Sequence, residues 1–243
     1  MRERVLAKGA ESQRVTTIPP WSHDDAVGFS REGREAFRRR HGLTDQFVVM
    51  YSGNHSPCHP LDTLLDAALT LQGREAITFC FVGGGSEQAK VKAFAQRHAL
   101  RNVKCLPYQP LNELSHSLSA ADLHIVVMGE GFVGIVHPCK IYNILSVGAP
   151  VLYIGPTPSH VTDIAAENKS FFLARHGDVD SVVEDILLAR EQRARVSRGK
   201  QIFSKQTILP ELISVIGGGN PFEDLFRSLP DSDSRLTDYH AAH

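Results

Sequence analysis

The sequence predicts an α/β domain built on a doubly wound parallel sheet, and two patterns lead to this prediction. Short runs rich in β-branched and aromatic residues alternate with helical patterns across roughly residues 45–175. These runs are continuously apolar rather than alternating, as expected for strands that are buried on both faces.

The expected elements follow one another in a regular order. Apolar runs predict strands at residues 15–18, 47–52, 77–82, 103–106, 123–128, 150–154 and 170–173. Helical spacing of apolar residues predicts helices at 61–71, 87–98, 111–118, 140–147 and 161–167. Gly148 stands where a glycine closes a helix, and Pro150 prevents its continuation. An Arg-rich helical stretch (179–205), a short apolar helix (208–216) and a loose tail end the chain.

Composition and charge narrow the class of protein. The chain has 243 residues, of which 42% are hydrophobic and 22% charged, so it is expected to be globular rather than disordered or fibrous. A net charge of −1 argues against nucleic-acid binding through bulk charge. No apolar run approaches the ~18 residues of a membrane span, and the amino terminus lacks the apolar centre of a secretory signal. Widely spaced cysteines favour a reducing cytoplasm: Cys58, Cys80, Cys105 and Cys139.

The loops that follow the predicted strands are the candidate functional segments. In an open α/β sheet, ligands bind beyond the carboxyl ends of the strands, next to helix amino termini. Four of the five loops there contain glycine; they are residues 53–55, 83–85, 107–109, 129–134 and 155–156. This clustering predicts a binding site at that edge of the sheet.

The triplet Gly83-Gly84-Gly85 lies between a predicted strand and a predicted helix. Glycines there let a ligand or a backbone segment approach closely and leave amide groups free for phosphate. A tight strand-to-helix turn explains them equally well. Their spacing matches neither the dinucleotide motif GxGxxG nor the phosphate-binding loop GxxxxGK[ST].

Lys140 lies in the first turn of the helix that begins near Pro138. The helix dipole disfavours a cation at this position unless an anion lies between them, so Lys140 is a candidate phosphate ligand. Its alternative is a solvated lysine. Glu130, in the same glycine-rich loop, is a candidate for binding sugar hydroxyls, and its alternative is a surface acid.

Two further patterns have a functional and an ordinary interpretation. A zinc site across two loops is an alternative for His55, Cys58, His59, His137 and Cys139. Hydrogen bonds from the histidines to a ligand explain these residues better, because neither cluster has zinc-finger spacing. The basic runs at residues 31–40 and 190–200 could bind anionic lipid, or they could form a solvated helix face.

An ordered set of strings then resembles one family. These strings are IPPW, FVVMYSGN, LDTLLDAA, FVGGG, LPYQPLNELSHSLSAADLHIV and PCKIYNILSVGAPVLYIG. Together they resemble the carboxyl-terminal half of GT4-family glycosyltransferases over about residues 14–215. They are similar in particular to the colanic-acid-type branch, which acts in bacterial exopolysaccharide and O-antigen assembly.

The resemblance implies a fold and a set of binding residues. Such enzymes have the GT-B fold, in which two Rossmann-like halves face a cleft and the carboxyl-terminal half binds the nucleotide-sugar donor. Residues 1–13 would then begin the interdomain segment, 14–216 would form the donor-binding domain and 217–243 the loose tail. The candidate catalytic residues are Lys140 and Glu130. The candidate donor-binding residues are Gly53, Asn54, His55, His59, Gly83, Gly84, Tyr108, Gln109, Gly134 and Asn143.

The resemblance also implies which part of the donor each of these residues would face. The loop at residues 53–59 and Lys140 would face the diphosphate, Tyr108 and Gln109 the base, and Asn143 the ribose. The loop before Pro138 would approach the sugar. No metal or other cofactor is expected, because the nucleotide sugar is itself the substrate.

The sequence also departs from the family pattern. Many members carry Arg and Lys after the first strand, whereas this loop reads NHSPCHP and holds no fixed cation. Two missing charge-assisted contacts would cost about 1.5–3 kcal/mol each, unless Lys140 or a protonated histidine compensates. Many members also share two glutamates. In this sequence Ile135 and Asn143 stand at those two positions. In the resembled enzymes the acceptor-binding half precedes this region, so the resemblance implies that this sequence lacks it.

The sequence therefore predicts the donor-binding half of a retaining glycosyltransferase. It would transfer a hexose-type sugar to a saccharide, expected to be lipid-linked, in surface polysaccharide assembly, in the cytoplasm or at the inner face of the membrane. Alone it is expected to bind donor weakly and transfer little, and a separate chain with the other half, or self-association, is the expected partner. The alternatives are a non-catalytic nucleotide-sugar-binding or regulatory module, a GT-B-fold epimerase and a zinc-dependent protein.

Overall fold

The computed structural model describes residues 2–21, 27–74, 76–166, 170–192 and 205–217. At its centre lies a parallel sheet with the strand order β3-β2-β1-β4-β5-β6. This is the order of a doubly wound, Rossmann-like sheet, so the predicted fold class is confirmed. The strands are β1 (Phe47–Asn54), β2 (Ile77–Gly84), β3 (Val103–Leu106), β4 (Leu123–Val127), β5 (Val151–Ile154) and β6 (Phe171–Ala174).

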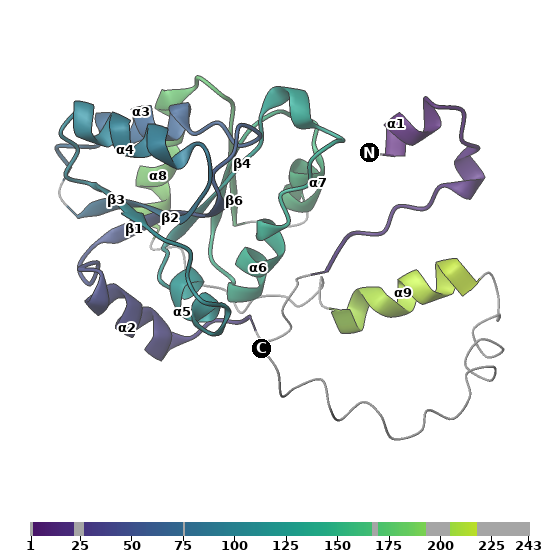
Figure 1. Ribbon diagram of the computed structural model, residues 1–243, viewed down its shortest axis with the longest axis horizontal. Helices are drawn as coiled ribbons and strands as arrows, with labels where there is room; N and C mark the ends of the chain where they lie inside the picture. Colours follow the sequence, from purple (N-terminus) through teal and green to yellow (C-terminus); the bar gives the residue numbers. More distant parts are fainter. Residues whose placement is uncertain (1, 22–26, 75, 167–169, 193–204, 218–243) are drawn as a thin grey trace.

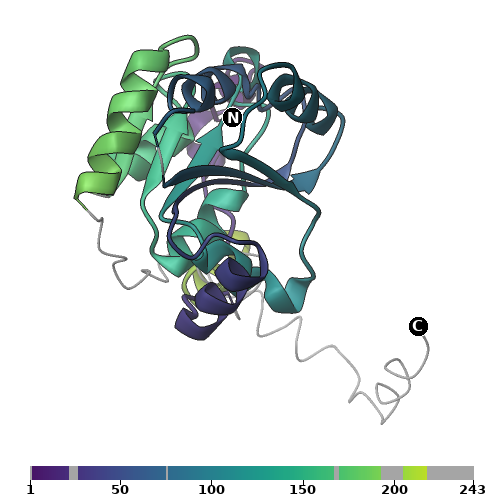
Figure 2. The same ribbon diagram turned by 90° about the vertical axis from the view of Figure 1, so that its left-hand side faces the viewer.

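Helices cover both faces of the sheet (Figures 1 and 2). One layer consists of α3 (Asp62–Thr70), α4 (Gln88–Arg97) and α8 (Val179–Glu191). The other consists of α2 (Arg31–Arg40), α5 (Leu114–Ser119) and α6 (Lys140–Val147), with α7 (His160–Ala166) packed against α6. Two helices, α1 (Arg2–Leu6) and α9 (Lys205–Gly217), lie outside these layers in Figure 1. Short 3-10 helices are η1 (Ser12–Arg14), η2 (Leu111–Glu113) and η3 (Glu130–Phe132).

Strand β1 shows why the apolar runs are continuous. Val49 and Tyr51 pack into the cluster beneath α3 and α8, whereas Val48 and Met50 pack against Phe37 of α2. All of these side chains are buried. Neither face of residues 48–51 meets water, so these positions favour apolar side chains, and each buried side chain stabilises the fold by about 1.5–3 kcal/mol.

Most predicted elements form, but some expectations are wrong. Residues 15–18 form no strand; they run directly into Pro19-Pro20, and no strand in the described part of the chain pairs with them. The single helix expected at 111–118 is divided into η2 and α5. The loose tail beyond Gly217 and residues 193–204 of the Arg-rich stretch lie outside the described residues, and the three-part division of the chain stays a prediction.

The basic run at residues 31–40 forms α2, which packs against the sheet. The sequence pattern did not predict a helix there. The side chain of Ser30 accepts a hydrogen bond from the Gly33 amide and so begins the helix. Two of its arginines point into the fold instead of forming an outer basic face. Among the described helices, none is both long enough and apolar enough to cross a membrane.

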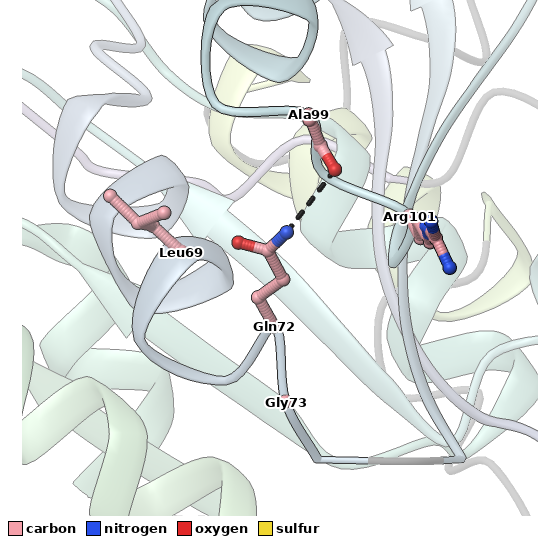
Figure 3. Close-up of a pocket in the computed structure, with 5 residues that line it drawn as sticks. All are labelled: Leu69, Gln72, Gly73, Ala99 and Arg101. Atoms are coloured by element: carbon pink, nitrogen blue, oxygen red, sulfur yellow. Dashed lines mark hydrogen bonds between the residues drawn. The ribbon is translucent and has the colours of Figure 1, made fainter.

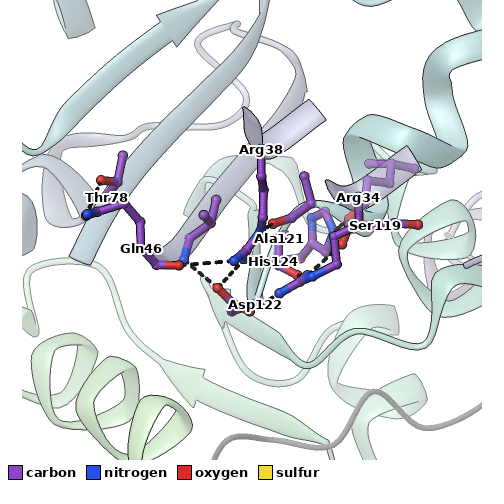
Figure 4. A network of polar contacts seen from close by, with 11 residues as sticks. Arg34, Arg38, Gln46, Thr78, Ser119, Ala121, Asp122 and His124 are labelled. Carbon is purple, nitrogen blue, oxygen red and sulfur yellow. Dashed lines mark hydrogen bonds and ion pairs between the residues drawn. The ribbon is translucent and has the colours of Figure 1, made fainter. Parts of the chain in front are cut away.

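Those two arginines, Arg34 and Arg38, converge on Asp122, which directly precedes β4 (Figure 4). The Asp122 carboxylate also accepts a hydrogen bond from the Val48 amide of β1, with 2.7 Å between nitrogen and oxygen. Arg34 donates further to the carbonyls of Ser119 and Ala121. One carboxylate thus joins α2, the start of β1 and the segment between α5 and β4.

We expect Asp122→Asn to lower the free energy of unfolding by about 2–3 kcal/mol. The substitution keeps the size of the side chain but leaves two partly buried guanidinium groups without their counter-ion. Urea denaturation measures the change. Glu35→Gln is the matched control: Glu35 pairs with Arg31 and Arg39, its side chain is 54% exposed, and its loss is expected to cost less than about 1 kcal/mol. Equal effects in the two variants would contradict the structural role of Asp122.

Candidate functional site

The candidate site lies at the carboxyl ends of β1 and β4. Strand β1 is followed along the chain by α3, which lies in one helix layer, and β4 is followed by α6, which lies in the other. The chain therefore leaves these two neighbouring strands toward opposite faces of the sheet. Such a topological switch point is where open α/β sheets bind ligands. The two loops are in contact, because the Gly129 amide donates to the Cys58 carbonyl at 2.9 Å and His59 Nδ1 lies 2.7 Å from the Val127 carbonyl oxygen.

Glycines allow the ends of β1 and β2 to pack closely. Gly53, Gly83 and Gly85 all have φ near +130°, a conformation that side chains disfavour. A Cβ atom at Gly83 would collide with the carbonyl oxygen of Gly53, and one at Gly85 with that of His55. The close approach predicted for the glycine triplet is therefore made by the chain's own backbone. Amide groups for phosphate at Gly83 and Gly84 stay a prediction.

Lys140 is the buried cation of this edge. It is the first residue of α6, and its Nζ atom lies 3.6 Å from the centroid of the Tyr51 ring, beside Gly53. The Nζ atom is buried and has no hydrogen-bond partner among the described residues. Burial away from water lowers the pKa of Lys140 to about 7. The solvated lysine considered as its alternative is thereby excluded, and a buried amine without a partner is what an anion at this helix end would complete.

His55 and His59 lie near the same lysine and are buried. Neither ring nitrogen of His55 has a partner among the described residues, and its ring packs edge-on against Tyr51 at 5.0 Å between centroids. Burial first, and then the charge of Lys140, lowers the pKa of both imidazoles, that of His59 to about 4. Both are therefore neutral at pH 7, so they do not supply the missing fixed cation, and Lys140 alone remains for that role within this cluster.

Tyr108 closes the site on the β2 and β3 side. Its ring lies against Gly84, where a Cβ atom would approach the ring to 3.0 Å, and its hydroxyl donates to the Gly84 carbonyl at 2.9 Å. The side chain is 58% exposed, so its outer face is open to a ligand. Gln109 next to it donates to the Pro107 carbonyl. Their place near a base stays a prediction.

The remaining predicted residues divide into two groups. Asn143 lies one turn after Lys140 on α6, and its Oδ1 atom is buried without a partner, so both residues belong to the face that meets the switch point. Glu130 lies at the exposed start of η3, in the loop between β4 and α6, and the Lys140 Nζ atom has no hydrogen-bond partner among the described residues. Gly134, in the same loop, has a left-handed backbone with φ +74°. The structure thus brings His55 and His59 close to Lys140.

Sequence reasoning missed Tyr51, whose ring contacts both Lys140 and His55. The sequence offers one signal for it: Tyr51 carries a hydroxyl within an otherwise apolar predicted strand, and a buried hydroxyl needs a hydrogen-bond partner. That partner is the Asn54 carbonyl, which the Tyr51 hydroxyl contacts at 2.7 Å. A second unpredicted cluster stacks the rings of His137 and His160 at 3.9 Å between centroids.

The zinc alternative finds no ligand cluster in the described part of the chain. No group of three or more His, Cys, Asp or Glu side chains there could hold a metal ion. His137 Nε2 lies 2.6 Å from the Tyr142 hydroxyl, and His59 is held by the Val127 carbonyl, so two of the proposed ligands have other partners.

A pocket of about 620 Å³ lies elsewhere, between the carboxyl ends of α3 and α4 (Figure 3). It is lined by Leu69, Gln72, Gly73, Ala99 and Arg101, and the Gln72 side chain bridges to the Ala99 carbonyl at 3.1 Å. Because α3 and α4 run antiparallel to the strands, this pocket lies at the amino edge of the sheet, opposite the candidate site. It includes none of the predicted site residues.

The strand order places the chain among the doubly wound, Rossmann-like α/β proteins. Residues 33–202 match the family described as glycosyl transferases group 1, and the chain belongs to this family. The resemblance predicted from the sequence is thereby confirmed.

Two relatives with known names are similar to this chain in sequence. WcaI of Escherichia coli (strain K12), named for a colanic acid biosynthesis glycosyl transferase, is 31% identical over 150 residues, which are 61% of this chain and 37% of WcaI. The glycosyltransferase WbjE of Pseudomonas aeruginosa is 26% identical over 120 residues, covering 49% of this chain and 30% of WbjE. The matched region thus spans about a third of these relatives' length.

The crystal structure of Anabaena HepE in complex with UDP and glucose has a similar fold. Its TM-score is 0.68 at 18% identity, and the match covers 94% of this chain and 61% of HepE. Identity at this level speaks for the fold alone. The likeness agrees with the predicted Rossmann-like half of a GT-B glycosyltransferase.

Gly83→Ala is expected to destabilise the protein by about 3 kcal/mol or more, because a side chain there meets both an unfavourable φ and the Gly53 carbonyl. Thermal and urea unfolding measure the loss. Gly131→Ala is the control, since a Cβ atom there has no neighbour within 4 Å and its φ lies outside the left-handed region. A neutral Gly83→Ala would show that the ends of β1 and β2 are not in tight contact.

Proposed function

We propose that the chain binds the nucleotide-sugar donor of a glycosyltransferase at the switch point between β1 and β4. The observation that carries this proposal is the buried, unpartnered ammonium of Lys140 at the amino terminus of α6. A cation and the positive end of a helix dipole repel one another. A diphosphate between them would satisfy both.

The proposed chemistry is electrostatic. When the bond between the anomeric carbon and the diphosphate oxygen breaks, negative charge grows on the departing nucleoside diphosphate. Lys140 and the positive end of the α6 dipole would stabilise that charge, and charges that are already in place need no reorganisation during the reaction. We further propose Asn143 for the ribose and Tyr108 for the base, because Asn143 has a buried free oxygen and Tyr108 an exposed ring face.

The finer assignments extend the family membership. We propose a hexose-type donor, retention at the anomeric carbon, no metal cofactor, and a saccharide acceptor in surface polysaccharide assembly. WcaI, whose name refers to colanic acid biosynthesis, supports the last of these. A lipid-linked acceptor and contact with the inner face of the membrane rest on the sequence resemblance.

A second candidate is a nucleotide-sugar-binding or regulatory module without catalysis. It is favoured by the loop after β1, where Asn54 and the neutral imidazoles of His55 and His59 stand in place of fixed cations. The two candidates differ in whether sugar is transferred, since both require the donor to bind.

Calorimetric titration of the chain with UDP, GDP, UDP-glucose and GDP-mannose tests the donor site. We expect saturable binding of one base, weakened about tenfold or more in Lys140→Met, because a charge-assisted contact of about 1.5–3 kcal/mol is lost. Lys92→Met, which removes an exposed lysine from α4, is expected to bind as the native chain does. Absence of binding for every nucleotide, or equal binding by Lys140→Met, would overturn the proposal.

Binding is also expected to depend on pH. Desolvation favours the neutral amine of Lys140, whereas a bound anion favours the charged form, so ligand binding raises its pKa from about 7 and takes up a proton above that pH. Affinity for a nucleotide sugar should therefore be constant below pH 7 and fall as the pH rises above it. Titrations at pH 7.5 in buffers of different ionisation enthalpy measure the proton uptake, and an uptake that persists in Lys140→Met would assign it to another group.

A further inference from the structure

The side chain that holds Lys140 in place is Tyr51. Its ring centroid is 3.6 Å from the Lys140 Nζ atom, which is within cation–π contact, and the ring is fully buried at 1% exposure. Gly53, two residues further along β1, leaves the space that the lysine occupies: a Cβ atom there would be 3.2 Å from both Nζ and Cε.

The Tyr51 ring is itself fixed on two sides. Its hydroxyl donates to the Asn54 carbonyl at 2.7 Å, which ties the ring to the end of β1. The imidazole of His55 packs against it at an interplanar angle of 68°. The face of the ring that meets the ammonium therefore has a set orientation, and the negative charge density of that face attracts a cation.

Among the described residues, no carboxylate pairs with Lys140. The titratable groups around the ammonium are Tyr51 of β1 and His55 and His59 of the following loop, and His124 of β4 also senses its charge. Burial raises the pKa of the Tyr51 phenol and lowers those of the three imidazoles, so all four are uncharged at neutral pH. Within the described residues, Lys140 forms no ion pair, and the ring face is the attractive contact it has.

We infer that Tyr51 is a positioning residue for Lys140: its ring face holds the ammonium at the carboxyl ends of β1 and β4, so that an arriving diphosphate meets a cation already in place. This inference rests on the proposed donor site and adds to it a residue that does not contact the donor's reacting atoms. The ring offsets part of the cost of burying the charge. Without it the lysine would lose its proton more readily and bind an anion less well.

The first test needs no ligand. In the native chain the Lys140 ε-protons, assigned with Lys140→Met, should show an upfield ring-current shift in NMR spectra that other lysines lack. An unshifted resonance would overturn the inference. Titration of the same resonances in Tyr51→Phe, which keeps the ring, should give the native midpoint. In Tyr51→Leu or Tyr51→Met the midpoint should fall by about one pH unit.

The second test uses UDP-glucose, or GDP-mannose if the guanine nucleotide is the one bound, since the diphosphate of a nucleotide sugar does not titrate near neutral pH. Tyr51→Leu should lose affinity severalfold at pH 7 and recover it below pH 6. Tyr51→Phe should follow the native profile. A loss of equal size at every pH would mark Tyr51 as merely structural and contradict the inference.

The two proposals fail in different ways. If no nucleotide binds but the ring-current shift and the lowered midpoint of Tyr51→Leu are observed, the donor site is wrong and the contact between Tyr51 and Lys140 stands. If a nucleotide binds through Lys140 but Tyr51→Leu titrates as the native chain does, the donor site stands and the positioning role is wrong. Tyr51→Phe and the native spectrum keep this distinction even if the non-aromatic variants do not fold.

Discussion

The junction of β1 and β4 is the constraint on which the rest of the structure depends. The two strands pair in register at Val49–Leu123 and Met50–His124, and at their amino ends Asp122 binds the Val48 backbone together with two arginines of α2. Those contacts set the orientation of β1 relative to β4. The Tyr51 ring and the β1 loop follow on one strand, and the loop leading to Lys140 follows on the other, so their meeting depends on that junction.

Much of the fold could be predicted because its signals are local. A strand covered on both faces is apolar along most of its length, and this pattern located β1, β2, β4 and β5 within one or two residues. The edge strands β3 and β6 are partly exposed, and shorter apolar runs located them equally closely. Gly148 closes α6 with φ +70°, as a glycine at that position predicts. The place of Lys140 in the first turn of its helix was likewise visible, because a lysine there conflicts with the helix dipole.

The parts that escaped prediction depend on contacts between distant segments. Arg34 and Arg38 have the pattern of a solvated basic face, and only the fold brings them to Asp122, more than eighty residues away. Residues 15–18 have strand-forming side chains but meet no partner strand. The protonation of His55 and His59 depends on burial and on Lys140, neither of which is a property of their own loop. Their roles toward a ligand stay predictions.

The contact of Gly83 with the Gly53 carbonyl has a consequence for how such a protein diversifies. It is formed by main-chain atoms, so the shape of the crevice floor does not depend on which side chains the neighbouring loops carry. The exposed side chains of the loop above it, Asn54 and Pro57, can therefore differ in chemistry while the strands beneath them keep their spacing. The backbone thus sets the shape of the floor, and redesign of ligand preference belongs at the exposed positions above it.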